Sequence, residues 1–287
     1  MQLKELIRTG TETVSRMYPE REAREMVFAF LEHHIGTKRH THIIEPEYEV
    51  SEEAVSDALS AFDRMGAGEP LQYVTGVADF YGRQFHVTPD VLIPRPETEI
   101  LCRNVLESVS DGTALDLCTG SGCIAWTLAL EMPGAKVTAV DISDGALAVA
   151  SSQDFSEEIG RTGAVAPEFI KADVLAGPSE SGLSGQYDIL VSNPPYVMDK
   201  EKALMRSNVL DHEPHLALFV PDDDPLIFYR AVARWALALL KKDGYGIVEI
   251  NEALGPQTAD IFSSAGLRNV EIVRDLSDRD RFVSFRR

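Results

Sequence analysis

Hydrophobic residues recur at helical spacing over the first part of the chain, from Leu3 to about Gly68. They form three stripes: Leu3, Leu6, Ile7, Val14 and Met17; Ala23, Met26, Val27, Phe30 and Leu31; and Val55, Ala58, Leu59, Phe62 and Met65. Ser51 is a good N-cap for the third helix, and Gly66 ends it. Because such stripes become buried when helices pack together, the pattern predicts a helical bundle over residues 1–70.

The helical pattern gives way to aromatic and β-branched residues between about Gln72 and Ile93. Several of these residues surround Gly82, and they are Phe80, Tyr81, Phe85 and Val87. We therefore expect a β-hairpin linker over residues 71–95, closed by Pro89 and Pro94. Pro96 suits the first position of a following helix, because proline lacks the N–H that is unsatisfied there.

Short apolar strands alternate with helical segments from Thr113 onward. The expected strands are Ala114 to Leu117, Val137 to Val140, Phe169 to Ile170, Asp188 to Val191, and Gly246 to Ile250. Such alternation predicts a parallel sheet with helices on both faces, the clearest helix being 225–241. Two last strands, 270–273 and 282–285, are joined by a short link that favours an antiparallel pair. Residues 96–287 are thus predicted to form an α/β domain.

Composition and charge narrow the classes of protein that fit this chain. The 287 residues are 44% apolar, enough for a substantial core, so a disordered or fibrous protein is excluded. Lys and Arg total 27 against 46 Asp and Glu, a net charge of −19. A protein that holds duplex DNA through its phosphates needs a cationic face, and this composition does not favour one.

Cysteine content and the N-terminal sequence indicate where the protein works. Cys102, Cys118 and Cys123 lack the spacing of a zinc site and the density of a disulfide scaffold. The N-terminus has no cationic segment followed by an apolar one, and no stretch is long enough to span a bilayer. We expect a cytoplasmic protein that acts as a monomer away from membranes.

The segment from Asp116 to Ala125 reads as a strand, a glycine turn and a helix. Gly120 and Gly122 allow a tight turn and a close approach to a ligand, toward which the helix N-terminus directs free N–H groups. The string also fits the G-x-G-x-x-[GA] pattern of nicotinamide-binding proteins. The turn therefore predicts a cofactor without identifying it.

Asp141 stands at the end of the second strand of this domain. A carboxylate at that position can accept hydrogen bonds from both hydroxyls of a ribose. NAD and S-adenosylmethionine both carry such a ribose, so Asp141 is consistent with either cofactor.

Asn193-Pro194-Pro195-Tyr196 follows an apolar strand at its carboxyl end, where ligands bind in open α/β sheets. An amide nitrogen is a poor nucleophile because its lone pair is delocalised, so it must be held and aimed. The Asn193 side-chain oxygen and the Pro194 carbonyl can each accept one N–H while the prolines fix the backbone. Tyr196 can pack on a planar substrate group. We interpret the segment as the catalytic centre for methyl transfer to nitrogen.

Together these segments resemble the class I S-adenosylmethionine-dependent N-methyltransferases. Three further motifs resemble the linker of the protein-(glutamine-N5) methyltransferases, the HemK/PrmC family: Glu69-Pro70-Leu71-Gln72-Tyr73-Val74-Thr75-Gly76, Phe80-Tyr81-Gly82 and Leu92-Ile93-Pro94-Arg95-Pro96-Glu97-Thr98-Glu99. The resemblance covers nearly the whole chain. It implies a Rossmann-like methyltransferase domain over residues 96–287 and a partner-binding helical bundle over residues 1–70.

The resemblance also implies roles for individual residues. The family's cofactor contacts fall on Cys118, Thr119, Gly120, Ser121, Gly122, Asp141, Ile142, Asp173, Val174 and Asn193. Its catalytic and substrate contacts fall on Asn193, Pro194, Pro195 and Tyr196. The family's partner is a peptide-chain release factor, in which it methylates the glutamine of a Gly-Gly-Gln motif. This chain departs from the family pattern at Asn251, where glycine is more usual, and at 220–224.

Three other functions fit parts of the sequence. An adenine-N6 DNA methyltransferase uses the same Asn-Pro-Pro-Tyr chemistry on a flipped base, although the acidic composition argues against it. A nicotinamide-dependent oxidoreductase would use only the glycine turn, and a non-catalytic adaptor would bind the cofactor without turnover. The histidine pairs His40 with His42 and His212 with His215 lack the further ligands of a metal site, and none is expected.

Overall fold

The computed structural model describes all 287 residues and divides into two compact units. The first comprises Met1–Val77 together with Met205–His212, and the second comprises Ala78–Leu204 and Glu213–Arg287. A short segment from the later part of the chain therefore belongs with the N-terminal helices.

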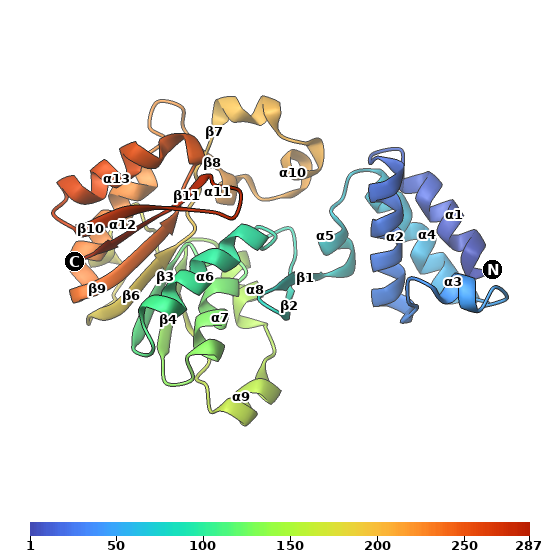
Figure 1. The fold of residues 1–287 in the computed structure, drawn as a ribbon, viewed down its shortest axis with the longest axis horizontal. Helices are drawn as coiled ribbons and strands as arrows, with labels where there is room; N and C mark the ends of the chain where they lie inside the picture. Colours follow the sequence, from blue (N-terminus) through green and yellow to red (C-terminus); the bar gives the residue numbers. More distant parts are fainter. The chain divides into compact units, whose positions relative to one another are not determined.

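The first unit is helical, as predicted (Figure 1). Its helices are α1 (Leu3–Val14), α2 (Glu20–Ile35), α3 (Thr41–Ile44), α4 (Glu52–Gly66), α5 (Leu71–Thr75) and α10 (Ser207–His212). The Ser51 hydroxyl caps α4 by accepting a hydrogen bond from the Ala54 N–H. Leu6, Val27 and Phe62 are fully buried, which confirms that the apolar stripes meet in one core.

The structure contains the predicted β-hairpin, but it covers only part of the predicted linker 71–95. β1 (Val77–Phe80) pairs with β2 (Arg83–His86), whereas residues 71–75 form helix α5. Pro70 begins that helix and Gly76, at φ +75°, ends it. Leu71 and Val74 of α5 pack on the core of the helical unit, and not in a hairpin. Tyr81 and Gly82 both have positive φ, as two-residue hairpin turns require.

The second unit is built on a seven-stranded sheet in the order β10-β11-β9-β6-β3-β4-β5. The strands are β3 (Thr113–Leu117), β4 (Lys136–Asp141), β5 (Glu168–Lys171), β6 (Tyr187–Ser192), β9 (Leu240–Glu249), β10 (Arg268–Arg274) and β11 (Asp280–Arg286). Only β11 runs antiparallel to its neighbours. The mostly parallel sheet with a reversed C-terminal strand is confirmed. A separate pair, β7 (Val197–Met198) and β8 (Phe219–Val220), is too short for its pattern to predict.

Helices cover both faces of this sheet (Figure 1). Helices α6 (Pro96–Ser108), α7 (Cys123–Glu131) and α8 (Asp144–Ser151) lie on one face, and α12 (Ile227–Leu239) and α13 (Gly255–Ser264) lie on the other. The remaining elements are α9 (Ser156–Thr162), α11 (His215–Leu218), η1 (Pro178–Glu180), η2 (Asp199–Leu204) and η3 (Glu252–Leu254). No helix is both long and apolar enough to cross a membrane.

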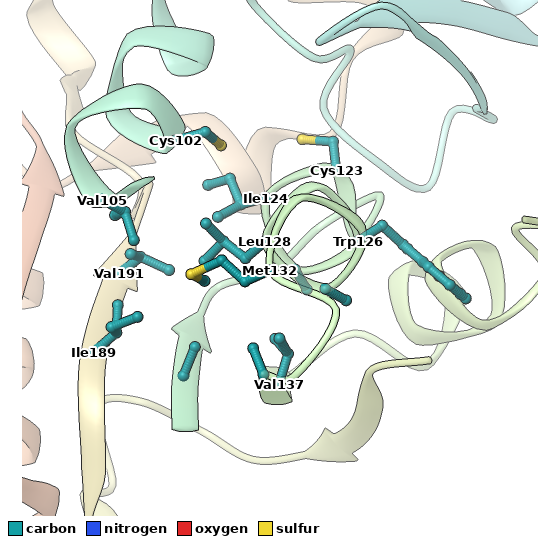
Figure 2. Packing of buried hydrophobic residues seen from close by; sticks show 14 of the residues in the cluster. Cys102, Val105, Cys123, Ile124, Trp126, Leu128, Met132, Val137, Ile189 and Val191 are labelled. Carbon is teal, nitrogen blue, oxygen red and sulfur yellow. The ribbon is translucent and has the colours of Figure 1, made fainter. Parts of the chain in front are cut away.

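Alternate residues of each central strand enter opposite cores. Ile189 and Val191 of β6 pack with α6 and α7, while Leu190 packs with α12. Figure 2 shows the first of these cores, where Cys102 of α6 and Leu128 of α7 lie near β6. This two-sided burial explains why the central strands read as continuous apolar runs.

The carboxyl ends of four parallel strands lie along one edge of the sheet. Leu117 pairs with Val140 on one side and with Ser192 on the other, and Ser192 pairs with Val248. The segments that follow β3, β4, β6 and β9 therefore emerge next to one another. The chain's candidate chemistry lies in these segments.

Candidate active site

A cavity opens at this edge of the sheet, entirely within the second unit. Ten of the predicted site residues line it: Cys118, Thr119, Gly120, Ser121, Asp141, Ile142, Asp173, Val174, Asn193 and Pro195. Gly122, Pro194 and Tyr196 do not belong to its lining. The cofactor turn and the Asn-Pro-Pro-Tyr turn thus share one cavity.

The two glycines of the cofactor turn have different roles. Gly120 has φ +55°, and an added Cβ would meet nothing within 4 Å. Gly122 has φ +79°, and its Cβ would come within 3.0 Å of Ala150 and 3.2 Å of Trp126. An added side chain at Gly122 would therefore also collide with core side chains, so this glycine is required by packing as well as by its positive φ.

Asp141 is held in a fixed orientation by the turn it faces. Its Oδ2 accepts a hydrogen bond from the Gly120 N–H at 2.9 Å, and its Oδ1 accepts one from the Ser143 N–H at 3.0 Å. A carboxylate has about four lone-pair sites, so each oxygen keeps capacity for another donor. The arrangement fits a ligand that presents two neighbouring hydroxyls to Asp141.

Asp116 lies beneath the turn and is fully buried. Its Oδ2 accepts a hydrogen bond from the Thr119 hydroxyl at 2.6 Å, which supports the turn from below. Burial raises the pKa of Asp116 to about 7, and the nearby charge of Asp141 adds to the increase. Asp116 therefore supports the turn through a hydrogen bond, and its buried position makes its carboxyl group harder to ionise.

The cysteines of the turn are poorly suited to nucleophilic chemistry. Burial raises the pKa of the Cys118 thiol well above its usual value, and it raises that of Cys123 to about 12. A thiol that stays protonated is a weak nucleophile. Neither thiol is therefore expected to act as a nucleophile in this cavity.

Asn193 leaves the end of β6 and projects its amide toward α6. Its Nδ2 donates a hydrogen bond to the Thr98 hydroxyl oxygen at 3.2 Å. The Ser192 hydroxyl donates to the Leu117 carbonyl at 2.7 Å, which ties this turn to the neighbouring strand. Asn193 is thus anchored through its nitrogen, and its Oδ1 is left to act as an acceptor.

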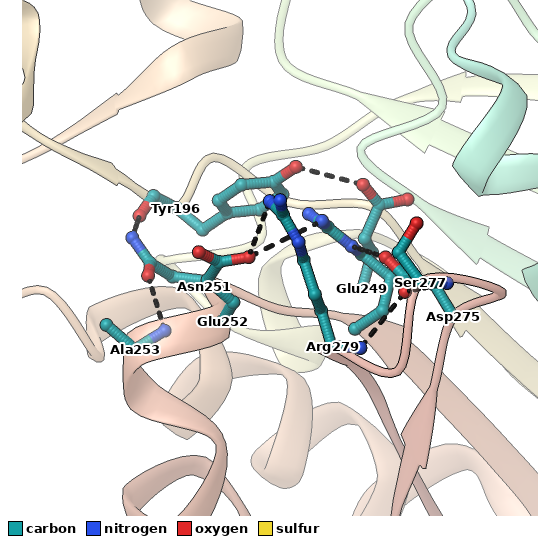
Figure 3. A network of polar contacts seen from close by, with 9 residues as sticks. Tyr196, Glu249, Asn251, Glu252, Ala253, Asp275, Ser277 and Arg279 are labelled. Carbon is teal, nitrogen blue, oxygen red and sulfur yellow. Dashed lines mark hydrogen bonds and ion pairs between the residues drawn. The ribbon is translucent and has the colours of Figure 1, made fainter. Parts of the chain in front are cut away.

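Tyr196 directs its hydroxyl toward the buried Glu249. The hydroxyl donates to Glu249 Oε1 at 2.9 Å, and the ring packs on the core beside α12 (Figure 3). Burial raises the pKa of Tyr196 well above its usual value. Tyr196 therefore fixes the turn from behind the cavity.

Asn251, the departure from the family pattern, has a structural role of its own. Its Nδ2 donates to the Tyr196 carbonyl, and its Oδ1 accepts the Ala253 N–H and so caps η3 (Figure 3). The same Nδ2 also donates to Glu201. Asn251 is buried with these bonds made. The asparagine side chain fastens the end of the Asn-Pro-Pro-Tyr turn to the loop after β9.

The second departure, 220–224, lies in β8 and in the turn that follows it. Asp222 accepts a hydrogen bond from the Lys200 N–H, and Asp224 pairs with Arg230. None of these residues lines the cavity. Their aspartates tie the loop to neighbouring segments.

Several residues near the cavity were not expected from the sequence. Thr98, in the first turn of α6, lines it and donates to the buried Glu249 at 2.7 Å. Arg95 pairs at 2.6 Å with Glu213, which also accepts the Ile93 N–H. The pair fastens residues 90–95 to the segment 214–217, and both segments line the cavity. In the sequence, Arg95 and Thr98 are marked only by the Pro94–Glu99 motif, which the resemblance assigns to a linker, and no motif marks Glu213.

Glu99, in the first turn of α6, holds the hairpin turn in place. Its Oε1 accepts the Tyr81 N–H at 2.9 Å, which joins the hairpin turn to α6.

No group of three metal-ligating side chains occurs anywhere in the structure.

The fold and the cavity define a class I methyltransferase: a seven-stranded sheet with a reversed strand, a glycine turn after β3, an acid after β4 and Asn-Pro-Pro-Tyr after β6. Two family models match the chain. "Methyltransferase small domain" covers residues 96–215, and "PrmC N-terminal domain" covers residues 5–76.

Curated relatives agree with this class. The chain is 44% identical to a release factor glutamine methyltransferase of Bacteroides thetaiotaomicron over 225 residues, 78% of each chain. It is 34% identical to that of Flavobacterium psychrophilum over 278 residues, 95% of this chain and 94% of the relative. Among solved structures, a release factor-specific protein-(glutamine-N5) methyltransferase of Alicyclobacillus acidocaldarius is 27% identical, with a TM-score of 0.41, and the match covers 71% of this chain and 99% of that one.

The protein therefore belongs to the family of release factor glutamine methyltransferases. The resemblance drawn from the motifs is confirmed, and the protein is a methyltransferase that uses S-adenosylmethionine as its class does. The oxidoreductase and DNA methyltransferase alternatives are not favoured by these relatives.

Proposed function

We propose that this protein transfers the methyl group of S-adenosylmethionine to the side-chain amide nitrogen, N5, of the glutamine in the Gly-Gly-Gln motif of a peptide-chain release factor. The observation that carries the proposal is that Asn193 and the cofactor turn line the same cavity. The relatives' names supply the substrate, and the cavity supplies groups that suit it.

The cavity has donors and acceptors that match the parts of S-adenosylmethionine. Asp141 keeps an acceptor site on each oxygen for the ribose hydroxyls. Ile142 and Val174 are apolar lining residues suited to the adenine faces, and Asp173 can accept from the adenine amine. When bound, the cofactor supplies a methyl group on a positively charged sulfur.

Asn193 and Pro194 hold the nitrogen that receives the methyl group. The Asn193 Oδ1 accepts one N–H of the glutamine amide, and the Pro194 carbonyl accepts the other. With both hydrogens fixed, the face of the nitrogen is aimed at the methyl carbon, and the positioning replaces chemical activation. A carbon–nitrogen bond forms as the carbon–sulfur bond breaks, and the nitrogen then loses a proton to water.

The helical bundle of residues 1–70 is proposed to hold the release factor, while the methyltransferase domain of residues 96–287, joined to it by the linker 71–95, carries out the transfer. The helical unit matches its own family model, separate from that of the methyltransferase domain. Its four-residue helix α3 carries Ile43 and Ile44, which are 67% and 75% exposed and available for a protein partner.

Asn193→Ala tests the proposal with radiolabelled cofactor and a purified release factor. Transfer is expected to fall by at least about 100-fold, since one of two positioning acceptors is lost. Asn104→Ala is the matched control, because Asn104 bonds only the Ile100 carbonyl on α6 and lies outside the cavity. Full transfer by Asn193→Ala refutes the assignment. Labelling of a competing oligonucleotide in preference to the release factor refutes the substrate.

A further inference from the structure

A chain of three hydrogen bonds runs from Asn193 into the interior of the second unit. Asn193 Nδ2 donates to the Thr98 hydroxyl oxygen at 3.2 Å, and the Thr98 hydroxyl donates to Glu249 Oε2 at 2.7 Å. Glu249 Oε1 accepts the third bond, from the Tyr196 hydroxyl. The three elements that meet here are the turn after β6, the first turn of α6 and the last residue of β9.

The chemistry of Glu249 sets the direction of this chain. An ionised carboxylate can only accept hydrogen bonds, so the single hydroxyl hydrogen of Thr98 must point toward Glu249. The Thr98 oxygen can then only accept, and it must accept from the nitrogen end of the Asn193 amide. The oxygen end of Asn193 is consequently left for the cavity, which Asn193 lines.

Packing holds Glu249 in place for this task. Glu249 is 1% exposed, and each of its oxygens accepts a bond from a different residue. Burial raises the pKa of Glu249, while the hydrogen bonds from Thr98 and Tyr196 and the positive charge of Arg281 act against that increase and favour the ionised form. Tyr196 is itself fixed through its carbonyl, which accepts from Asn251 (Figure 3). The carboxylate at the end of the chain is therefore rigid.

We propose that Thr98 and Glu249 are positioning residues that fix which end of the Asn193 amide faces the cavity, and that they thereby make the site select a glutamine amide over a glutamate carboxylate. The proposal rests on the proposed function and deepens it, because it concerns how the same site tells its substrate from a close analogue.

The two side chains have nearly the same shape, so the cavity cannot separate them by size. A glutamine amide offers N–H donors to the Asn193 oxygen, whereas a glutamate carboxylate offers only acceptors. If the Asn193 amide were turned over, its N–H groups would attract the carboxylate instead. Selection by hydrogen-bond direction is strong, because a mismatch leaves buried polar groups unpaired.

Four variants of the full chain separate positioning from packing. Thr98→Val removes the hydroxyl at nearly constant volume, and Thr98→Ser keeps it. Glu249→Gln keeps the shape but adds a donor that lets the chain reverse. Thr127→Val is the matched control, since Thr127 is buried on the neighbouring helix α7 and its hydroxyl has no partner.

The measurements are kcat and KM for the release factor, and its affinity in the presence of S-adenosylhomocysteine. The same affinity is measured for a release factor whose motif glutamine is replaced by glutamate. The ratio of the two affinities reports the amide direction, which a purely structural role does not change. Thermal melting and S-adenosylhomocysteine affinity report folding and the cofactor site for each variant.

For Thr98→Val and Glu249→Gln we expect the glutamine-to-glutamate affinity ratio to fall about 10- to 100-fold, the effect of one mismatched buried hydrogen bond. For Thr98→Val kcat falls by a similar factor, while S-adenosylhomocysteine affinity is unchanged. Thr98→Ser restores both quantities, and Thr127→Val matches the unmodified protein.

An unchanged affinity ratio in Thr98→Val overturns the inference, even if kcat falls. Equal losses in Thr98→Ser and Thr98→Val also overturn it, because packing would then be the cause. If Glu249→Gln does not fold, the two Thr98 variants still decide the question. Failure of the proposed function looks different, because the unmodified protein would then not methylate the release factor at all.

Discussion

The buried carboxyl of Asp116 makes the stability of the second unit depend on pH. In the unfolded chain its pKa is near 3.8, and in the folded protein it is about 7. Between these values the folded state keeps a proton that the unfolded state releases. Stability therefore falls as pH rises through this window, and it stops falling above about pH 7, where both states are ionised.

Asp116→Asn removes this titration while keeping an oxygen for the Thr119 hydroxyl. Each pKa unit corresponds to about 1.4 kcal/mol, so between pH 5 and pH 8 the unmodified protein is expected to lose about 3 kcal/mol through Asp116 alone. The variant lacks this loss. The remaining titratable groups are common to both proteins and cancel in the comparison.

The assay is urea denaturation of both proteins at pH 5 and pH 8, followed by fluorescence. Asp188→Asn is the matched control. Burial acts to raise the pKa of Asp188, but Lys241 and Thr113 outweigh it and lower the pKa below 3.8, so Asp188 is ionised in both the folded and the unfolded state from pH 5 to pH 8. Asp188→Asn should therefore keep the pH dependence of the unmodified protein over this range. If Asp116→Asn shows the same pH dependence as the unmodified protein, Asp116 is ionised when folded and the reasoning is refuted.

Four other substitutions test the site and its surroundings. Gly122→Ala should lower the melting temperature by several degrees, because its Cβ meets Ala150. Gly120→Ala should chiefly weaken the binding of S-adenosylhomocysteine, measured by calorimetry. Equal effects of the two substitutions on the melting temperature would contradict this difference. Asp141→Ala should weaken cofactor binding by about 10- to 100-fold while the protein stays folded, and unchanged affinity would contradict its role. Thr258→Val should raise stability by about 1 kcal/mol in urea denaturation, because it removes a buried hydroxyl without a partner; a loss of stability would show that the hydroxyl is bonded.

The fold was largely predictable because its signals are local. Strand β6, which includes Leu190, is buried on both faces and therefore appears in the sequence as a continuous apolar run. The helix that contains Phe62 is buried on one face only, so its apolar residues recur at helical spacing. Helix α5 was missed because its five residues are too few to show a period beside a hairpin.

The candidate site was predictable only where its residues lie close together in the chain. The turn at 116–125 and the turn at 193–196 carry their own motifs, and the resemblance linked them. Thr98 and Glu249 are far apart in sequence, and only the register of β6 beside β9 and the start of α6 bring them to Asn193. The hydroxyl of Tyr196 likewise bonds Glu249, a partner that its own motif does not contain.

The central claim is that Asn193 presents an amide nitrogen of a release factor to the methyl group of S-adenosylmethionine. The most direct measurement is peptide mass spectrometry of a release factor incubated with S-adenosylmethionine and either the unmodified protein or Asn193→Ala. The account predicts one methyl group, on the glutamine of the Gly-Gly-Gln motif, with the unmodified protein only. A methyl group at another residue, or equal methylation by Asn193→Ala, would contradict it.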